Sequence, residues 1–296
     1  MSLTSAMYTG TSGLLANANA LSVIGNDISN SNTVGYKSAT TLFADMLSQN
    51  IGNNSQVGTG VKVQDISNNF SQGSLENTTN ATDLAIQGNS FFALAAPNTT
   101  AATNQNAAYL TRAGSFNVNS SYNLVNPDGY EVLEAKDGLP IKFSYVNGTT
   151  AGDFSKVTAI DSKGVITYQD VSGNSYYYNG NGGAVLLATS ANYNTALANG
   201  AIAVVTPPNT AGLTKVGGTL FQSTAASGVP ASAFTAATNT TNGTSQQLLS
   251  NELELSNVDM ATELVNMLTT QRAYSANSKT ITTADQMTQT VLCLVQ

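Results

Sequence analysis

The sequence predicts an α+β protein in which N- and C-terminal helices form a coiled-coil-like terminal domain and the middle forms a central antiparallel β-rich domain. Apolar residues recur at helical spacing at both ends of the chain, and between them the pattern changes to short alternating runs broken by turn residues. The 296 residues are enough to bury a sizeable core. Charged residues make up only 9% of the chain, about a third of the usual share.

The N-terminal pattern predicts a helix over residues 3–28. Its apolar residues are Leu3, Met7, Leu14, Leu21 and Ile28, and the last four form a strict seven-residue repeat. Glycines at three positions inside the pattern, 10, 13 and 25, each cost about 1 kcal/mol relative to alanine. The helix is therefore expected to be weak by itself.

The stretch "ALSVIGNDISNSNTVGYKS", residues 20–38, begins as an amphipathic helix and continues as asparagine, serine and glycine. Asn30, Asn32 and Gly35 tolerate turn conformations, and asparagine side chains bond to the local backbone. We expect the helix to end shortly after Ile28 and the chain to turn away there.

The C-terminal pattern predicts a helix of about 35–40 residues. Ser256 followed by Asp259 resembles a capping box. From Met260 onward, apolar residues recur at helical spacing: Leu264, Met267, Leu268, Tyr274, Ile281, Met287, Val291 and Leu294. Its best seam carries Gln271, Ser278 and Asp285 where a self-sufficient dimer would prefer leucine or isoleucine.

Two weak terminal helices favour a subunit whose ends become helical only on assembly. Burying the five N-terminal anchors yields roughly 1.5–3 kcal/mol each as an upper estimate. Ordering the backbone costs on the order of 1–2 kcal/mol per residue before other contacts offset it. Packing among further copies would bury additional faces of both helices.

The middle of the chain reads as many short strands. The expected strands lie at 60–67, 83–94 with a hairpin turn at Gly88-Asn89, 108–118, 157–170 with a turn at 161–164, and 175–189. Small polar residues at 96–107 and 223–247 predict long loops. The expected divisions are 1–37 (N-terminal helix and linker), 38–69 (connector), 70–234 (β-rich domain), 235–255 (connector) and 256–296 (C-terminal helix).

The amino-acid composition argues against most kinds of catalytic site, metal site and charged partner. With 10 basic against 17 acidic residues and a net charge of −7, nucleic acid and anionic membrane surfaces are not expected partners. The chain has no histidine and one cysteine, Cys293, which is expected to be a buried apolar residue. A single chain therefore cannot form a disulfide, a zinc cluster or a Ser-His or Cys-His pair. We expect no catalytic, cofactor or metal site and no small-molecule substrate.

The search for targeting signals does not decide the cellular compartment of the protein. The chain has no run of 18 or more apolar residues, and its first 25 residues lack the features of a secretory signal. These rules favour the cytosol, but a charge-poor chain rich in asparagine, serine and threonine is also typical of secreted filament proteins.

Three short motifs have ordinary explanations. "GTG" at 58–60 precedes a strand and does not open a helix, as a phosphate-binding loop would. "NPDGYE" at 126–131 and "DSKG" at 161–164 lack the spacing of a calcium loop and suit turns. A rival interpretation takes Asp128 and Glu131 as paired carboxylates of a secreted hydrolase or carbohydrate-binding β protein, which would have a cleft and ordered termini.

The stretch at 20–38 is similar to the signature of the bacterial flagellar rod and hook family, in which an N-terminal helix ends in an asparagine-rich segment before Gly-Tyr-Lys. Its linker residues here are Asn26, Asn30, Asn32, Gly35, Tyr36 and Lys37, and Val34 stands where the family usually has proline. Further long matches follow in order at 60–94, 109–133, 212–230 and 253–292.

The resemblance implies a structural, non-enzymatic subunit of the flagellar hook, a tubular flexible joint that transmits torque from rod to filament. Both chain ends would form a helical domain lining a central channel, with β domains outside. Implied partners are further copies in a helical homopolymer, the flagellar rod, the hook cap and the hook–filament junction proteins. The implied location is the extracellular flagellum, reached through the flagellar type III export apparatus without a cleaved signal.

Two motifs, "LFADM" at 42–46 and "SNVD" at 256–259, look like the hook protein within this family. The alternative is a distal rod subunit, a stiff drive shaft, since 296 residues leave little room for the extra outer domain that many hook proteins carry.

Overall fold

The computed structural model describes residues 3–52, 55–97, 109–143, 154–180, 183, 186–229 and 246–294. The chain divides into two compact units. The helical unit contains Met1–Ser31, Lys37–Asn69 and Val258–Gln296, and the β unit contains Asn32–Tyr36 and Phe70–Asn257. Terminal helices and a central antiparallel β region confirm the predicted α+β class.

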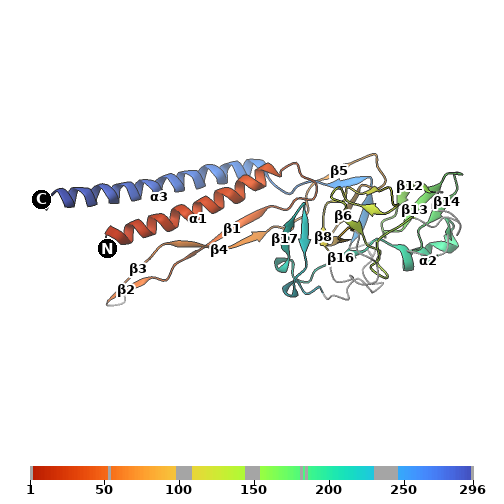
Figure 1. The fold of residues 1–296 in the computed structure, drawn as a ribbon, viewed down its shortest axis with the longest axis horizontal. Coiled ribbons are helices and arrows are strands. Elements are labelled where there is room, and N and C mark those ends of the chain that lie inside the picture. Colours follow the sequence, from red (N-terminus) through yellow and green to blue (C-terminus); the bar gives the residue numbers. More distant parts are fainter. Residues whose placement is uncertain are drawn as a thin grey trace. The chain divides into compact units, whose positions relative to one another are not determined.

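Two long helices dominate the helical unit. α1 (Leu3–Ser29) and α3 (Met260–Leu294) lie side by side and run antiparallel (Figure 1). Strands β1 (Ala39–Asp45) and β4 (Val61–Asn68) form an antiparallel ribbon packed along α1, and β2 (Gln49–Gly52) pairs with β3 (Ser55–Val57). The 35-residue length of α3 confirms the predicted C-terminal helix.

Small residues form the contact between α1 and α3. A Cβ atom built on Gly10 would lie 2.8 Å from Ile281 Cγ1, and one built on Gly13 would lie 2.6 Å from Asn277 Nδ2. Ala16 and Ala20, which follow on α1, are buried. Two of the glycines that weaken α1 as an isolated helix therefore let the second helix approach closely.

The "GTG" motif has a similar structural role at the ribbon. Gly60 has a φ of +123°, and a Cβ atom there would lie 2.1 Å from Ser12 Oγ. The backbone N–H of Val61 donates a hydrogen bond to Ser12 Oγ at 3.3 Å. The glycine thus brings the start of β4 against α1.

The β unit is built around an eight-stranded antiparallel sheet. Its path is β17 (Thr214–Gly217), β18 (Leu220–Gln222), β8 (Tyr109–Thr111), β7 (Phe91–Ala95), β11 (Glu131–Val132), β10 (Leu124–Val125) and β9 (Asn117–Val118), with β16 (Val204–Val205) also paired to β7. Strand β7 is buried on both faces, because Phe92 and Leu94 join one core cluster while Phe91, Ala93 and Ala95 join another. Such burial explains the continuous apolar run "FFALA".

A second sheet has the order β12 (Phe154–Ile160), β13 (Ile166–Asp170), β14 (Ser175–Tyr177) and β15 (Leu186–Leu187). The turn predicted at 161–164 joins β12 to β13, and its Gly164 has a φ of +83°. Helix α2 (Ser190–Gly200) and the 3₁₀ turns η1 (Thr210–Gly212) and η2 (Ala225–Ser227) were not expected. Residues 98–107 and 230–245 of the two predicted loops lie outside the described residues.

The hairpin predicted at Gly88-Asn89 is wrong, although the chain does turn there. The strand before the turn, β6 (Leu84–Gln87), pairs with β19 (Gln247–Ser250), and the strand after it, β7, belongs to the eight-stranded sheet. A neighbouring pair has the same long-range character, since β5 (Leu75–Asn77) pairs with β20 (Glu252–Glu254). C-terminal segments thus complete sheets begun far earlier in the chain.

We expect Gly25→Ala and Gly13→Ala to have opposite effects on stability. A Cβ atom at Gly25 meets nothing within 4 Å, so alanine should stabilise α1 by about 1 kcal/mol through helix propensity. At Gly13 the new methyl group would press on Asn277 and separate the helices. Thermal unfolding followed by circular dichroism should show a raised midpoint for the first variant and a lowered one for the second. Equal stabilisation by both would contradict the close contact.

Candidate functional site

Several large apolar side chains of α1 and α3 remain exposed although the two helices pack together. Near the start of α3, Met260, Leu264 and Leu268 are spaced four residues apart and 45–56% exposed. Near its end, Met287, Val291 and Leu294 are 54–80% exposed. Each set occupies one side of the helix because residues three or four apart are neighbours on a helix surface. We call these sets the first and second apolar patches of α3.

The predicted assembly residues divide by exposure. Met7, Leu14, Leu21, Ile28, Met267 and Ile281 are half-buried, whereas Leu264, Leu268, Tyr274, Met287, Val291 and Leu294 are exposed; the side chain of Leu3 lies outside the described residues. On α1, Tyr8 and Leu15, seven residues apart, are 76% and 64% exposed. An unpaired helix surface with this much exposed apolar area is typical of a protein–protein contact.

Asp259 begins α3, which corrects the predicted capping box. Its Oδ1 accepts hydrogen bonds from the backbone N–H groups of Ala261 at 3.0 Å and Thr262 at 3.5 Å, and its Oδ2 accepts one from the Thr262 hydroxyl at 2.9 Å. The N-cap is thus Asp259, not Ser256. These hydrogen bonds, that of the Thr262 side chain first, lower the pKa of Asp259.

The signature residues fall into an exposed and a buried group. Asn26 and Asn32 are exposed, Asn30 is half-buried, and its Nδ2 donates to the backbone oxygen of Asn26 at 2.8 Å. α1 ends at Ser29, as the asparagine-rich stretch predicts. Gly35, Tyr36 and Lys37 are buried.

Asp27, a charged residue that the sequence did not single out, is fully buried at the end of α1. Its Oδ2 accepts a hydrogen bond from the backbone N–H of Ala39 at 3.0 Å. This bond fixes the start of β1 against the end of α1. Lys37, two residues before Ala39, is also fully buried.

The β unit contains a buried ion pair that the sequence did not reveal. Arg112 Nη1 lies 3.3 Å from Glu254 Oε2, with the side chains 1% and 0% exposed. Burial lowers the pKa of Arg112, and the charge and hydrogen bond of Glu254 act in the opposite direction. In a chain with so few charges, an arginine inside the apolar pattern "YLTRAGSF" was the available signal.

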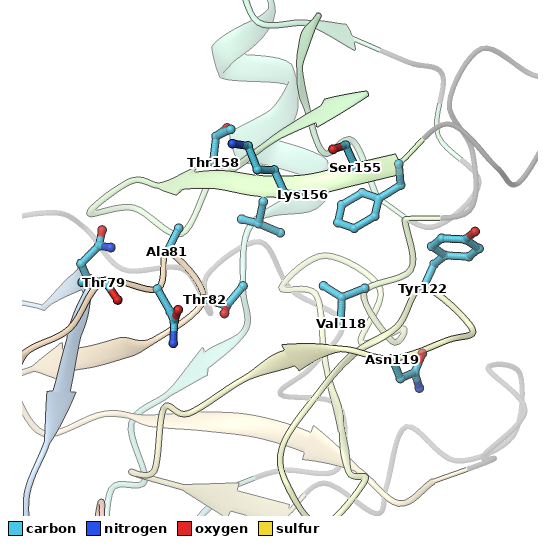
Figure 2. A pocket seen from close by; sticks show the side chains of 13 residues that line it. Thr79, Ala81, Thr82, Val118, Asn119, Tyr122, Ser155, Lys156 and Thr158 are labelled. Carbon is cyan, nitrogen blue, oxygen red and sulfur yellow. The ribbon is translucent and has the colours of Figure 1, made fainter. Parts of the chain in front are cut away.

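A polar groove of about 690 Å³ lies beside β12 in the β unit (Figure 2). Figure 2 shows Ser155, Lys156 and Thr158 along the strand, with Tyr122 and Asn119 on a neighbouring turn. Of its thirteen lining residues, Lys156 is the one with a charged side chain. Hydroxyl and amide groups make this groove suited to hydrogen bonding, and it offers no acid–base pair.

The carboxylates of the hydrolase interpretation lie in a turn and at the start of the strand that follows it, β11. Glu131 is buried and accepts a hydrogen bond from Asn123 Nδ2 at 2.6 Å, while Asp128 is exposed. Asn126 Oδ1 accepts from the backbone N–H of Tyr130 at 2.7 Å, which closes the turn. The described residues hold no cluster of three or more histidine, cysteine, aspartate or glutamate side chains placed to bind a metal.

Two further sequence expectations concern the ends of the chain. Cys293 is exposed on the last turns of α3, which corrects the prediction that it is buried; its apolar neighbours Leu292 and Leu294 are exposed as well. Within the described ranges, no helix combines the length and apolar character that crossing a bilayer requires.

Comparison with known proteins assigns the family. Residues 7–37 match the flagella basal body rod protein family, residues 85–168 match the D1 domain of flagellar hook protein FlgE/F/G, and residues 249–294 match the C-terminal region of flagellar basal body rod FlgEFG proteins. The chain is 33% identical to flagellar basal-body rod protein FlgG of Bacillus subtilis over 97% of its own length and 98% of that protein. The chain belongs to the flagellar rod and hook family.

Relatives of both types within this family are similar to the chain. Rod protein FlgG of Borreliella burgdorferi is 30% identical over 95% of both chains. Hook protein FlgE of Brucella abortus is 38% identical over 171 residues, which are 52% of this chain and 41% of the hook protein. The family is one of structural flagellar components, and the three matched regions contain the linker residues of the signature, part of the β unit core and α3.

The cap of α3 should make helix content depend on pH. Hydrogen bonds lower the pKa of Asp259 from its ordinary value of 3.8, so its contribution to stability is complete above that value and is lost as the pH falls through the lower folded pKa. We expect helix content of the wild-type chain to decline below about pH 4 more than that of Asp259→Asn, which caps without titrating. Circular dichroism from pH 6 to pH 2 measures this, and identical profiles would exclude the carboxylate as the source.

Proposed function

We propose that this chain is a structural subunit of the bacterial flagellar hook, which polymerises into a tubular flexible joint between rod and filament. The observation that carries the proposal is how small and large apolar residues are distributed on the terminal helices. Small residues make the contact between α1 and α3, and the large apolar residues are left exposed at both ends of α3. In a family of rod and hook components, further copies of the chain are the natural partners for those patches.

In the polymer, the residues at 1–37 and 256–296 would form the terminal helical domain, with coiled-coil-like packing between subunits around a central channel. The segment 38–69, which forms the ribbon beside α1, and the segment 235–255, which includes β19 and β20, would connect it to the β-rich domain at 70–234. Tyr8 and Leu15 on α1 and both apolar patches of α3 would contact neighbouring subunits. These contacts would stabilise the helices in the polymer beyond what the monomer provides.

The proposed partners beyond the homopolymer are the rod, the hook cap and the hook–filament junction proteins. The chain would reach the outside of the cell through the flagellar type III export apparatus. A low content of charge and the absence of disulfides in a single chain suit passage of an unfolded polypeptide.

Two motifs, one in the helical unit and one at the boundary between the units, support hook over rod. "LFADM" contributes to β1 and the residue after it, where Leu42, Phe43 and Met46 are 39–46% exposed. "SNVD" ends at Asp259, the cap of α3. The 38% identity to a hook protein agrees with this choice.

The second candidate function is a distal rod subunit, a stiff drive shaft. End-to-end similarity to FlgG proteins favours it, because those proteins match this chain over 95–98% of their length. The hook match covers 41% of that longer relative. The two candidates differ in the mechanics of the polymer.

Leu264→Asp with Leu268→Asp should abolish polymerisation and leave the monomer folded. Both side chains are about half exposed, so a charge costs little in the monomer but would be buried in a subunit contact. Sedimentation after induced polymerisation measures assembly, and thermal unfolding checks the fold. Val171→Asp is the matched control, since Val171 is 72% exposed on the β unit. Normal polymers from the double variant would refute the first patch as a contact.

Electron microscopy of polymers grown from the purified chain should separate hook from rod. We expect curved tubes that adopt a range of curvatures, because a joint must bend while it rotates. Uniformly straight tubes would assign the chain to the rod and leave the subunit contacts of α3 unchanged. A chain that stays monomeric under all conditions would refute both candidates.

A further inference from the structure

Glu254 joins three distant segments of the β unit. Its Oε2 pairs with Arg112 Nη1 at 3.3 Å, and its Oε1 accepts the backbone N–H of Gly73 at 2.9 Å. Its own backbone oxygen accepts the N–H of Gly35 at 2.7 Å. The side chain is fully buried. A single residue of β20 therefore binds the signature segment, the segment before β5 and the end of β8.

The guanidinium of Arg112 fixes this arrangement to the core. Its Nη2 donates to the backbone oxygen of Gly88 at 2.7 Å, and its Cζ lies 4.9 Å from the centre of the Phe91 ring. Its Nε is buried without a hydrogen-bond partner. A buried cation with one unpaired N–H depends strongly on its counter-ion, because removing one partner of a buried pair leaves an uncompensated charge.

Gly35 can occupy its position only as glycine. Its φ is +67°, and a Cβ atom there would lie 2.3 Å from the backbone nitrogen of Ala113 and 2.6 Å from the carbonyl carbon of Arg112. Both are backbone atoms that cannot move aside cheaply. The signature glycine thus packs directly on the residue pair that carries the buried arginine.

Neighbouring residues extend the same contact. The backbone N–H of Asn257 donates to the oxygen of Tyr36 at 3.4 Å, and Asn257 Nδ2 donates to the backbone oxygen of Ser71 at 3.2 Å. Lys215 Nζ lies 4.2 Å from the centre of the Tyr36 ring, which is buried. The N–H of Leu255 donates to the oxygen of Ser74 at 2.8 Å. Three segments are therefore bonded to one another at one place.

We propose that residues 33–36, 71–74 and 254–257 form a clasp, centred on Glu254 and Arg112, that holds the signature segment in one path and transmits force from both chain ends into the core of the β unit. The chain enters the β unit from the end of α1 at Asn32, just before this clasp, and leaves it for the start of α3 directly after Asn257. Any tension along either terminal helix reaches the β unit through these residues first. The force-transmitting role rests on the proposed function, whereas the clasp itself is a property of the monomer.

The test compares Glu254→Gln with Glu252→Gln in the full-length monomer. Glu252 lies on the same strand and is half-buried, so it is a matched control outside the clasp. Hydrogen exchange measured by mass spectrometry should become at least tenfold faster in Glu254→Gln for peptides covering 32–37 and 71–75. The peptide covering β13 should be unchanged, and so should all three peptides in the control. Trypsin should newly cleave after Lys37, which is fully buried in the wild-type chain.

Two results would overturn the clasp. Wild-type protection of both peptides in Glu254→Gln would show that the residue does not hold them. Uniformly faster exchange across the β unit, β13 included, would reduce the ion pair to a general contribution to stability.

A double variant keeps the test valid if Glu254→Gln fails to fold. Arg112→Met with Glu254→Met removes both charges, and replacement of a buried pair by apolar residues of similar size is often tolerated. The Gly73 amide should then exchange rapidly, since its acceptor is the lost carboxylate, while the Gly35 amide stays protected because its acceptor is the backbone. Continued protection of Gly73 would overturn the proposal.

The mechanical role has its own measurement. Single-molecule pulling on the monomer, with handles at residues 3 and 294, should show that the β unit of Glu254→Gln unfolds at lower force than that of the wild type or Glu252→Gln. Equal unfolding forces would overturn the force-transmitting role. None of these measurements requires a polymer, so a failure of the clasp is separate from a failure of the hook assignment.

Discussion

Two helices approach closely only where their contacting side chains are small, and this constraint shapes the helical unit. Gly10 and Gly13 lie against Ile281 and Asn277, so α1 and α3 pack closely while many of the large apolar residues of the C-terminal pattern stay exposed. A helix pair that buried those side chains internally would have no apolar surface left for a partner. The apolar residues that remain exposed are unfavourable in an isolated chain, because they contact water, and they can be buried in an assembly.

Three of the chain's few charged residues, Asp27, Arg112 and Glu254, lie where separate segments of the chain meet. Asp27 binds the backbone at the start of β1, and Glu254 binds Gly73 and pairs with Arg112. Buried charges contribute little net stability, because the cost of desolvation offsets much of the attraction. They do penalise any arrangement that leaves a partner missing. Such residues therefore contribute more to determining which segments contact one another than to the stability of the fold.

The two terminal helices and the hairpin between β12 and β13 could be predicted from the sequence, whereas helix α2 and the long-range pairings could not. α1, α3 and the turn between β12 and β13 follow from periodicity and turn residues a few positions apart. The Gly88-Asn89 turn looked the same, but β6 pairs with β19, about 160 residues later in the chain. The glycines of α1 were predicted to destabilise that helix, because intrinsic helix propensity takes no account of packing against a second helix. The sequence did not single out Glu254, because its structural role depends on contacts with Arg112, Gly73 and Gly35, which lie far from it in the chain.

The exposed apolar patches of α3 and the motifs that look like the hook protein lie at different places in the structure. The patches on α3 depend on helix periodicity, which a stiff and a flexible polymer can share. The hook-type motifs lie elsewhere, on the β1 ribbon and at the cap of α3. In the proposed polymer, a change at those positions would leave the apolar patches of α3 intact. The chain matches FlgG of Bacillus subtilis over 98% of that protein and a hook protein of Brucella abortus over 41%, so the proposed hook role depends on these motifs and not on overall similarity.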